Sequence, residues 1–179
     1  AALLFTPNVT ISRALGGQEL YSVAGIGASI KWGADVLLDD AQRDKFDRQL
    51  RVFGAEGQNR LRSLRIGIVG LGGTGAIVAE QLAHLGISDF LLLDPDTVET
   101  SNLNRLLGAA PSDVGRPKVE VAGDLIRRIQ PYARVDADAT SVLLNKNASK
   151  LADVDFLFGC TDSHGSRAVL NQLSYQYLV

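Results

Sequence analysis

The chain has 179 residues, enough for one globular domain and a modest appendage. Hydrophobic residues make up 46% and charged residues 21%, proportions typical of folded proteins that argue against disorder. The net charge is −2 and no lysine or arginine tract stands out, which argues against a nucleic-acid or anionic-membrane binder. A single cysteine, Cys160, rules out a disulfide framework and a zinc site built from several thiolates. No targeting signal or stretch long enough to span a membrane is found, so we expect a cytoplasmic protein with no membrane partner.

The chain divides into two parts. Residues 1–37 mix apolar residues with glycines, which predicts short strands and turns. No chemistry is evident in them, and we interpret them as an N-terminal extension or the remnant of another domain. Residues 38–179 carry the regular elements. The chain stops inside a predicted helix, so we expect a fragment of something longer.

A helix is predicted from Asp39 onward, because Asp39 and Asp40 can cap its start. Phe46, Leu50 and Phe53 recur at i, i+4 and i+7 and form one apolar stripe. Gly54 interrupts the pattern, as does the glycine three residues later. Two pairs of opposite charge lie four residues apart on the polar side: Asp44 with Arg48, and Asp47 with Arg51.

Strands and helices then alternate. Short apolar runs predict strands at residues 65–69, at 89–93, within 134–143 and at 154–158. Helical periodicity predicts helices at 75–85, 118–129 and 166–179, with Gly86 as a C-cap. This alternation indicates an α/β fold: a Rossmann-like, doubly wound, mostly parallel sheet with helices on both faces, incomplete at the C-terminus.

A glycine-rich loop follows the first predicted strand and opens the next helix. It fits G-x-G-x-x-G with glycines at four positions: Gly70, Gly72, Gly73 and Gly75. Such glycines allow a tight turn and let backbone N–H groups approach a phosphate. Asp94 ends the next strand, 19 residues after Gly75, where a carboxylate could accept ribose hydroxyls. The alternative is a turn needed only for helix packing, with Asp94 as a strand-end cap.

The glycines alone leave an NAD-dependent oxidoreductase open, but three further features favour ATP. Asn102 and Arg105 lie in a polar loop after the second strand, where they could reach phosphate oxygens; the alternative is a solvated loop. Lys118 follows a proline at a helix start and could aim an ammonium at a triphosphate, or be a surface lysine. Asp162 follows the fourth strand, where it could bind Mg²⁺ or cap the next helix. Cys160 is more in keeping with a small buried residue than with a nucleophile.

Together these residues resemble the ThiF/MoeB/HesA family, the ubiquitin-activating-enzyme-like adenylyltransferases. The resemblance covers residues 46–179 and rests on six motifs in order: Asp47-Arg48-Gln49, the glycine loop, Leu93-Asp94-Pro95-Asp96, Ser101-Asn102-Leu103-Asn104-Arg105, Gly115-Arg116-Pro117-Lys118-Val119 and Cys160-Thr161-Asp162. Any one of them alone would be weak. Six in the expected order are specific.

The resemblance implies a function. The family adenylates the C-terminal carboxylate of a small ubiquitin-like or sulfur-carrier protein with Mg²⁺ and ATP, releasing pyrophosphate. By resemblance, the glycine loop, Asp94 and Asp96 would bind the nucleotide, and Asn102 would contact phosphate.

The same resemblance implies four catalytic side chains: Arg48, Arg105, Lys118 and Asp162. Arg105 and Lys118 would contact phosphates, and Asp162 would serve Mg²⁺. Arg48 would act as an arginine finger in the partner subunit's site, which implies a homodimer. Without the family, Arg48 is an ordinary exposed helix arginine paired with Asp44.

Two alternative functions remain open. An NAD-dependent oxidoreductase would explain the glycine loop and Asp94, but it leaves Arg105, Lys118 and Asp162 without a joint task. A non-catalytic nucleotide-binding partner subunit would have less need of the full set of phosphate contacts.

Overall fold

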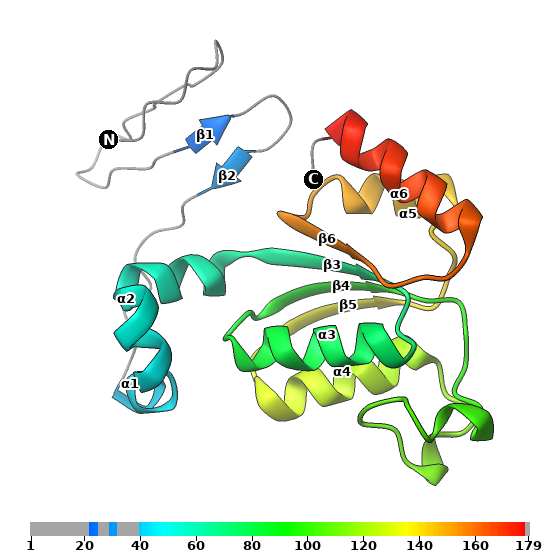
Figure 1. Ribbon diagram of the computed structural model, residues 1–179, viewed down its shortest axis with the longest axis horizontal. Coiled ribbons are helices and arrows are strands. Elements are labelled where there is room, and N and C mark those ends of the chain that lie inside the picture. The colour runs from blue at the N-terminus through cyan, green and yellow to red at the C-terminus, as the bar shows by residue number, and fades with distance from the viewer. Residues whose placement is uncertain (1–21, 25–28, 32–39, 178–179) are drawn as a thin grey trace.

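A four-stranded, all-parallel sheet with the order β5-β4-β3-β6 forms the centre of the fold (Figure 1). The computed structural model describes residues 22–24, 29–31 and 40–177. The strands of this sheet are β3 (Arg65–Val69), β4 (Asp89–Leu93), β5 (Arg134–Asp138) and β6 (Phe156–Gly159). The chain crosses from β3 toward β4 and β5, then returns to place β6 on the other side of β3. The strand order therefore reverses between β3 and β6, and at such a switch point α/β sheets bind ligands.

Helices cover both faces of the sheet (Figure 1). Helices α3 (Gly73–His84) and α4 (Lys118–Ile129) pack on one face, where Ile66, Ile68 and Phe90 are buried. Helices α5 (Asn145–Leu151) and α6 (His164–Tyr177) lie on the other, over Leu91 and Leu93. Successive side chains of a strand point to opposite faces, so the continuous apolar runs of β3 and β4 match a sheet covered on both sides. The predicted α/β class and doubly wound arrangement are confirmed.

The predicted bounds of β3, β4 and α4 agree with the structure, and Gly86 ends α3 with a φ of +97° as predicted. Helix α5 was not predicted. It has only seven residues and follows Leu144, which supplies no side-chain cap, so neither periodicity nor a start signal reveals it. Among the first 37 residues the structure describes one antiparallel pair of short strands, β1 (Ser22–Ala24) with β2 (Ser29–Lys31), in agreement with the prediction of short strands there. The proposed domain boundary near residue 37 stays a prediction.

Helices α1 (Asp40–Lys45) and α2 (Asp47–Ser63) attach to the C-terminal ends of α3 and α4. Three side chains donate to backbone carbonyls there: Lys45 Nζ to Ile129 at 2.8 Å, Gln49 Nε2 to His84 at 3.1 Å, and Gln58 Nε2 to Leu85 at 2.8 Å. These bonds satisfy carbonyls that a helix end leaves unpaired. The segment is thereby placed at the amino ends of the strands. Helix α1 begins at Asp40, so this predicted cap is the first residue of the helix, and Asp39, the other predicted cap, lies outside the described residues.

The predicted apolar stripe of α2 is only partly correct. Phe46 is buried and Leu50 half-buried, but Phe53 is 48% exposed. Phe46 packs under Gly86, whereas α2 changes direction one residue after Phe53, at Gly54 with φ +70°. Of the two glycines expected to interrupt the helix, Gly54 alone has a non-helical backbone.

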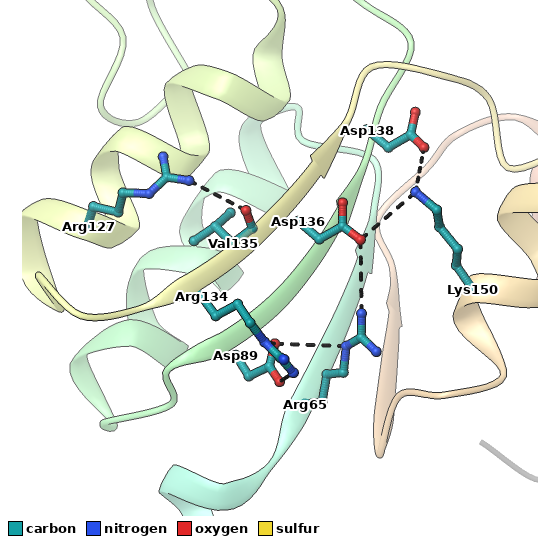
Figure 2. Close-up of polar contacts among 8 residues, drawn as sticks. All are labelled: Arg65, Asp89, Arg127, Arg134, Val135, Asp136, Asp138 and Lys150. Atoms are coloured by element: carbon teal, nitrogen blue, oxygen red, sulfur yellow. Dashed lines mark hydrogen bonds and ion pairs between the residues drawn. The ribbon is translucent and has the colours of Figure 1, made fainter.

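Charged residues cross the sheet face that carries α5 (Figure 2). Asp89 on β4 pairs with Arg134 on β5 and with Arg65 on β3, and Lys150 of α5 pairs with Asp138 at 2.9 Å. The hydrogen bond from Thr140, followed by the Lys150 ammonium, holds the pKa of Asp138 below its usual value. This network joins α5 and the three strands β3, β4 and β5.

None of the helices that the structure describes could cross a bilayer.

Candidate functional site

The glycine loop runs from the end of β3 into α3, beside the start of the β6–α6 connection. Gly70 has a φ of +91°, and a Cβ there would lie 2.7 Å from the Cys160 carbonyl oxygen. A Cβ at Gly75 would lie 1.9 Å from the Gly70 carbonyl oxygen. The Gly70 N–H donates to the Leu93 carbonyl at 2.8 Å, which ties the loop to β4. These two glycines are therefore required by the fold itself.

Gly72 differs from those two, because nothing in the protein requires it to be glycine. Its φ of −70° is ordinary, and a Cβ there would meet no atom within 4 Å. It is also the N-cap of α3 and supplies no side-chain hydrogen bond to the helix. The N-terminus of α3, where the helix dipole favours negative charge, thus opens onto free space at Gly72. A Cβ at Gly73 would lie 3.3 Å from the Arg105 carbonyl, so the loop bearing Arg105 lies beside this N-terminus.

Asp94 is buried, 5% exposed, at the end of β4. One carboxylate oxygen accepts the Leu71 N–H at 2.5 Å and the other accepts the Asp96 N–H at 2.8 Å. Its first role is therefore to hold the glycine loop against the chain leaving β4, in keeping with the strand-end interpretation. Each oxygen keeps a second lone pair, so the carboxylate retains capacity to accept ribose hydroxyls.

Residues 97–117 form a long connection that contains two 3₁₀ turns, η1 (Thr100–Asn102) and η2 (Pro111–Asp113). Asn102 is buried, and its Oδ1 accepts the Glu99 N–H at 3.3 Å, so the amide caps its own turn. Arg105 is exposed, and its guanidinium donates to the Ser101 carbonyl at 2.7 Å. Both side chains are engaged inside the loop, and contact with phosphate remains a prediction for each.

Lys118 is the first residue of α4 and pairs with Asp96, Nζ to Oδ2 at 2.7 Å. The lysine side chain is 12% exposed and the aspartate 62% exposed. The Lys118 N–H also donates to the Asp96 carbonyl at 3.0 Å. Asp96, predicted as a nucleotide ligand, thus acts in this structure as the carboxylate that holds the ammonium at the carboxyl edge of β4.

Asp162 lies in the connection from β6 to α6 and is exposed. The alternative interpretation of it as a helix cap is wrong: Ser163 Oγ accepts the Ser166 N–H at 3.4 Å, and the Ser163 carbonyl accepts the Arg167 N–H. Across the part of the chain that the structure describes, Asp162 has neither hydrogen bond nor ion pair. No group of three or more His, Cys, Asp or Glu able to hold a metal occurs within those same residues. A lone free carboxylate suits Mg²⁺, which takes one or two carboxylates together with substrate phosphates.

Cys160 is half-buried at the end of β6, and its N–H donates to the Val69 carbonyl at 2.8 Å. Burial raises the pKa of its thiol. A thiol with a raised pKa is a poor source of thiolate, which agrees with the prediction of a small packing residue rather than a nucleophile.

Arg48 is the one predicted site residue that the structure places elsewhere. It lies on α2, at the amino ends of the strands, whereas the glycine loop and Lys118 lie at the carboxyl ends (Figure 1). The predicted pairing with Asp44 is wrong for the described residues, where Arg48 is exposed and makes no ion pair; Asp47 does pair with Arg51, at 2.8 Å. Arg48 therefore lies far from this chain's own glycine loop, at the other end of the sheet, and its exposed side chain is free to contact something outside the chain.

Arg116 belongs to the motif that precedes Lys118, and the sequence predicts no role for it. Its guanidinium contacts Asp113 and Asp124, each at 2.7 Å. The backbone N–H of Ala110, followed by Arg116, lowers the pKa of Asp113, and the two carboxylates raise the pKa of Arg116. The signal available in the sequence was the spacing of Asp113 and Glu120, three residues before and four after Arg116.

Comparison with known sequences matches residues 46–179 to the ThiF family. The chain is 38% identical over 138 residues to the molybdopterin-synthase adenylyltransferase of Escherichia coli strain K12, covering 75% of this chain and 55% of that protein. It is 34% identical to the SAMP-activating enzyme E1 of Haloferax volcanii, over 76% of this chain and 51% of that one. The chain spans about half the length of these relatives.

Solved structures show the same fold. The tRNA N6-threonylcarbamoyladenosine dehydratase TcdA of E. coli superposes with a TM-score of 0.74 at 29% identity, covering 80% of this chain and 60% of that one. A structure of that protein in complex with ATP superposes with a TM-score of 0.73. The sheet and helices around the glycine loop are thus those of a fold that binds ATP in that relative.

Proposed function

The chain belongs to the ThiF family, and from that premise we propose that it adenylates the C-terminal carboxylate of a small ubiquitin-like or sulfur-carrier protein. The substrates are the carrier and Mg-ATP. A carboxylate oxygen of the carrier bonds to the α-phosphorus, the bond between the α-phosphorus and the bridging oxygen breaks, and pyrophosphate leaves.

One observation carries this proposal: complementary groups converge at the carboxyl edge of the sheet. The uncapped N-terminus of α3 opens at Gly72, and the cationic side chain of Lys118 follows the end of β4. Arg105 adjoins Gly73, and the free carboxylate of Asp162 follows β6. Negative charge on a transferring phosphoryl group is stabilised by fixed donors and cations of this kind.

Each side chain takes a role that its surroundings allow. The backbone N–H groups at Gly72 and Gly73 approach phosphate, and Asp94, already holding the loop, accepts ribose hydroxyls. Lys118 and Arg105 stabilise phosphate charge, and Asn102 contacts phosphate. Asp162 provides one carboxylate for Mg²⁺. Lys118 must exchange Asp96 for phosphate or contact both, since its ammonium has three donors.

Arg48 completes the proposal by acting in a second copy. It is exposed and lies at the opposite end of the sheet from Lys118, so it serves no phosphate bound at its own glycine loop. A two-fold homodimer would bring the same surface of each subunit to the other. We therefore place Arg48 in the partner subunit's site.

The test is ATP–pyrophosphate exchange in the presence of candidate carrier proteins. We expect carrier-dependent exchange, and a fall of about 10²-fold or more for Lys118→Ala, because removing one fixed donor to developing charge typically costs that much. Lys146→Ala, an exposed lysine on α5, is the matched control and should leave the rate unchanged.

Three other results would decide against the proposal. Exchange that survives Lys118→Ala and Asp162→Ala contradicts the assigned roles. Thermal stabilisation by NAD and not by Mg-ATP indicates an oxidoreductase. Binding of Mg-ATP without exchange for any carrier indicates a non-catalytic subunit, or, where tRNA supports the exchange instead, a different acceptor.

A further inference from the structure

The connection between β4 and α4, residues 97–117, is closed at its base by a short backbone clasp. Thr97 bridges Pro117, the Val98 N–H donates to the Arg116 carbonyl at 2.8 Å, and the Gly115 N–H donates to the Val98 carbonyl at 2.8 Å. We call these two short segments, residues 97–98 and 115–117, the clasp. Its last residue, Pro117, is directly followed by Lys118. Any shift of the clasp therefore shifts the start of α4 and its ammonium.

The connection also has its own small apolar core. Val98 and Leu106 are buried against Ala76 of α3 and Val121 of α4. This core holds the part of the connection that bears Asn102 and Arg105 against both helices. On the side of η2, by contrast, a hollow of about 240 Å³ separates the connection from α4.

Arg116 spans that hollow. One guanidinium nitrogen contacts Asp113 Oδ1 at 2.7 Å, and another contacts Asp124 Oδ2 on α4 at 2.7 Å, with Glu120 Oε2 at 3.8 Å. Asp113 in turn accepts the Ala110 N–H at 2.8 Å. The side chain of Arg116 is 41% exposed, so its contacts are accessible to salt and contribute little to global stability. Their effect is geometric: η2, the clasp and the second turn of α4 are joined through one planar group.

We propose that Arg116 is a positioning residue, which holds the clasp on α4 so that Lys118 and Arg105 stay aligned for the phosphates of a bound nucleotide. This inference rests on the proposed function. It assigns Arg116 no contact with substrate. The carboxylates of Asp113 and Asp124 hold the guanidinium and neutralise its charge.

The experiment compares the binding of Mg-ATP and of adenosine to the full chain by calorimetry. Arg116→Met keeps an unbranched apolar stem and removes the ion pairs with Asp113, Glu120 and Asp124. We expect the substitution to lower the affinity for Mg-ATP roughly tenfold, since small misplacements of the groups that contact a ligand have effects of this size or more. Adenosine, which has no phosphate for Lys118 or Arg105, should bind within about twofold of the wild type.

Two further variants sharpen the result. Arg116→Lys keeps one ion pair and should restore part of the affinity for Mg-ATP. Arg127→Met is the matched control. Arg127 lies on the same helix but contacts Asp124 and the Val135 carbonyl, not the connection. Its replacement should change the affinity for neither Mg-ATP nor adenosine. If Arg116→Met does not fold, Asp124→Asn removes, among the ion pairs of Arg116, only the one with Asp124. It should weaken the binding of Mg-ATP but not the binding of adenosine.

The inference is overturned if the Arg116 variants lose affinity for Mg-ATP and adenosine equally, because a general loss of structure does not distinguish phosphate from nucleoside. It is also overturned if they lose affinity for neither ligand. Wild-type protein that fails to bind Mg-ATP removes the proposed function and this inference with it. Wild-type protein that binds Mg-ATP, with affinity unchanged in Arg116→Met, overturns the inference alone.

Discussion

Asp94 shows how one side chain serves both the fold and the proposed chemistry. Both of its oxygens accept backbone N–H groups, from Leu71 in the glycine loop and from Asp96 beyond β4. The buried carboxylate therefore sets the distance between the loop and the chain that leads to Lys118. An asparagine cannot accept at both places, because one oxygen becomes an NH₂ donor facing another donor.

Asp94→Asn should consequently lower the free energy of unfolding by about 1–3 kcal/mol, the cost of leaving a buried polar group unpaired. Urea denaturation measures this change. Asp96→Asn is the control, since that carboxylate is 62% exposed and its pair with Lys118 should contribute less than about 1 kcal/mol. Equal effects of the two substitutions would show that the Asp94 hydrogen bonds do not hold the loop.

The turn between β3 and α3 separates structural glycines from a glycine that ligand binding would require. At Gly75 a Cβ would collide with the Gly70 carbonyl at 1.9 Å, whereas at Gly72 it would enter empty space. Both belong to the same sequence motif. The motif alone cannot rank them, because the difference depends on which backbone atoms the turn brings close.

Gly75→Ala should therefore cost at least about 2 kcal/mol of stability through forced backbone displacement. Gly72→Ala should leave the unfolding free energy unchanged or slightly raised, yet weaken Mg-ATP more than tenfold if phosphate approaches the helix N-terminus there. Thermal unfolding with and without Mg-ATP measures both quantities. Undiminished stabilisation of Gly72→Ala by Mg-ATP would place the nucleotide elsewhere.

Elements with strong local signals could be predicted, and those that depend on distant contacts could not. β3, β4 and α4 have continuous apolar runs or clear periodicity ending at Gly, Asp-Pro or Pro, and their bounds agree with the structure. Helix α5 was missed because it is short and uncapped. Phe53 was placed in the core by its spacing, but α2 changes direction at the next residue and leaves it half exposed.

At the scale of the molecule, the candidate site divides into two separated groups. The glycine loop, Asp94, Lys118 and Asp162 lie at the carboxyl ends of the strands, and Arg48 lies at the amino ends (Figure 1). Lys45 and Gln49, on either side of Arg48, donate to carbonyls at the ends of α4 and α3. They hold Arg48 on a fixed surface facing outward, as action on another copy would require.

Mixing two inactive variants tests this arrangement. Arg48→Ala and Lys118→Ala should each lose exchange activity, but a 1:1 mixture allowed to exchange subunits should regain roughly a quarter of wild-type activity, because half of the dimers are mixed and each has one intact site. If Arg48 acts within its own chain, no mixed dimer has an intact site. A mixture as inactive as its components would then refute the assignment.

Local chemistry was readable directly from the order of residues: an α/β alternation, a glycine turn at a helix start, acids at strand ends and the family to which they belong. Such features depend on near neighbours in the chain, where backbone geometry restricts what each residue can do. The tertiary structure alone decided that Asp96 pairs with Lys118, that Arg116 contacts Asp124, and that the helix bearing Arg48 lies at the opposite end of the sheet from the glycine loop. Those outcomes depend on which distant segments pack together, and hydrophobic burial is non-directional, so no local pattern specifies them.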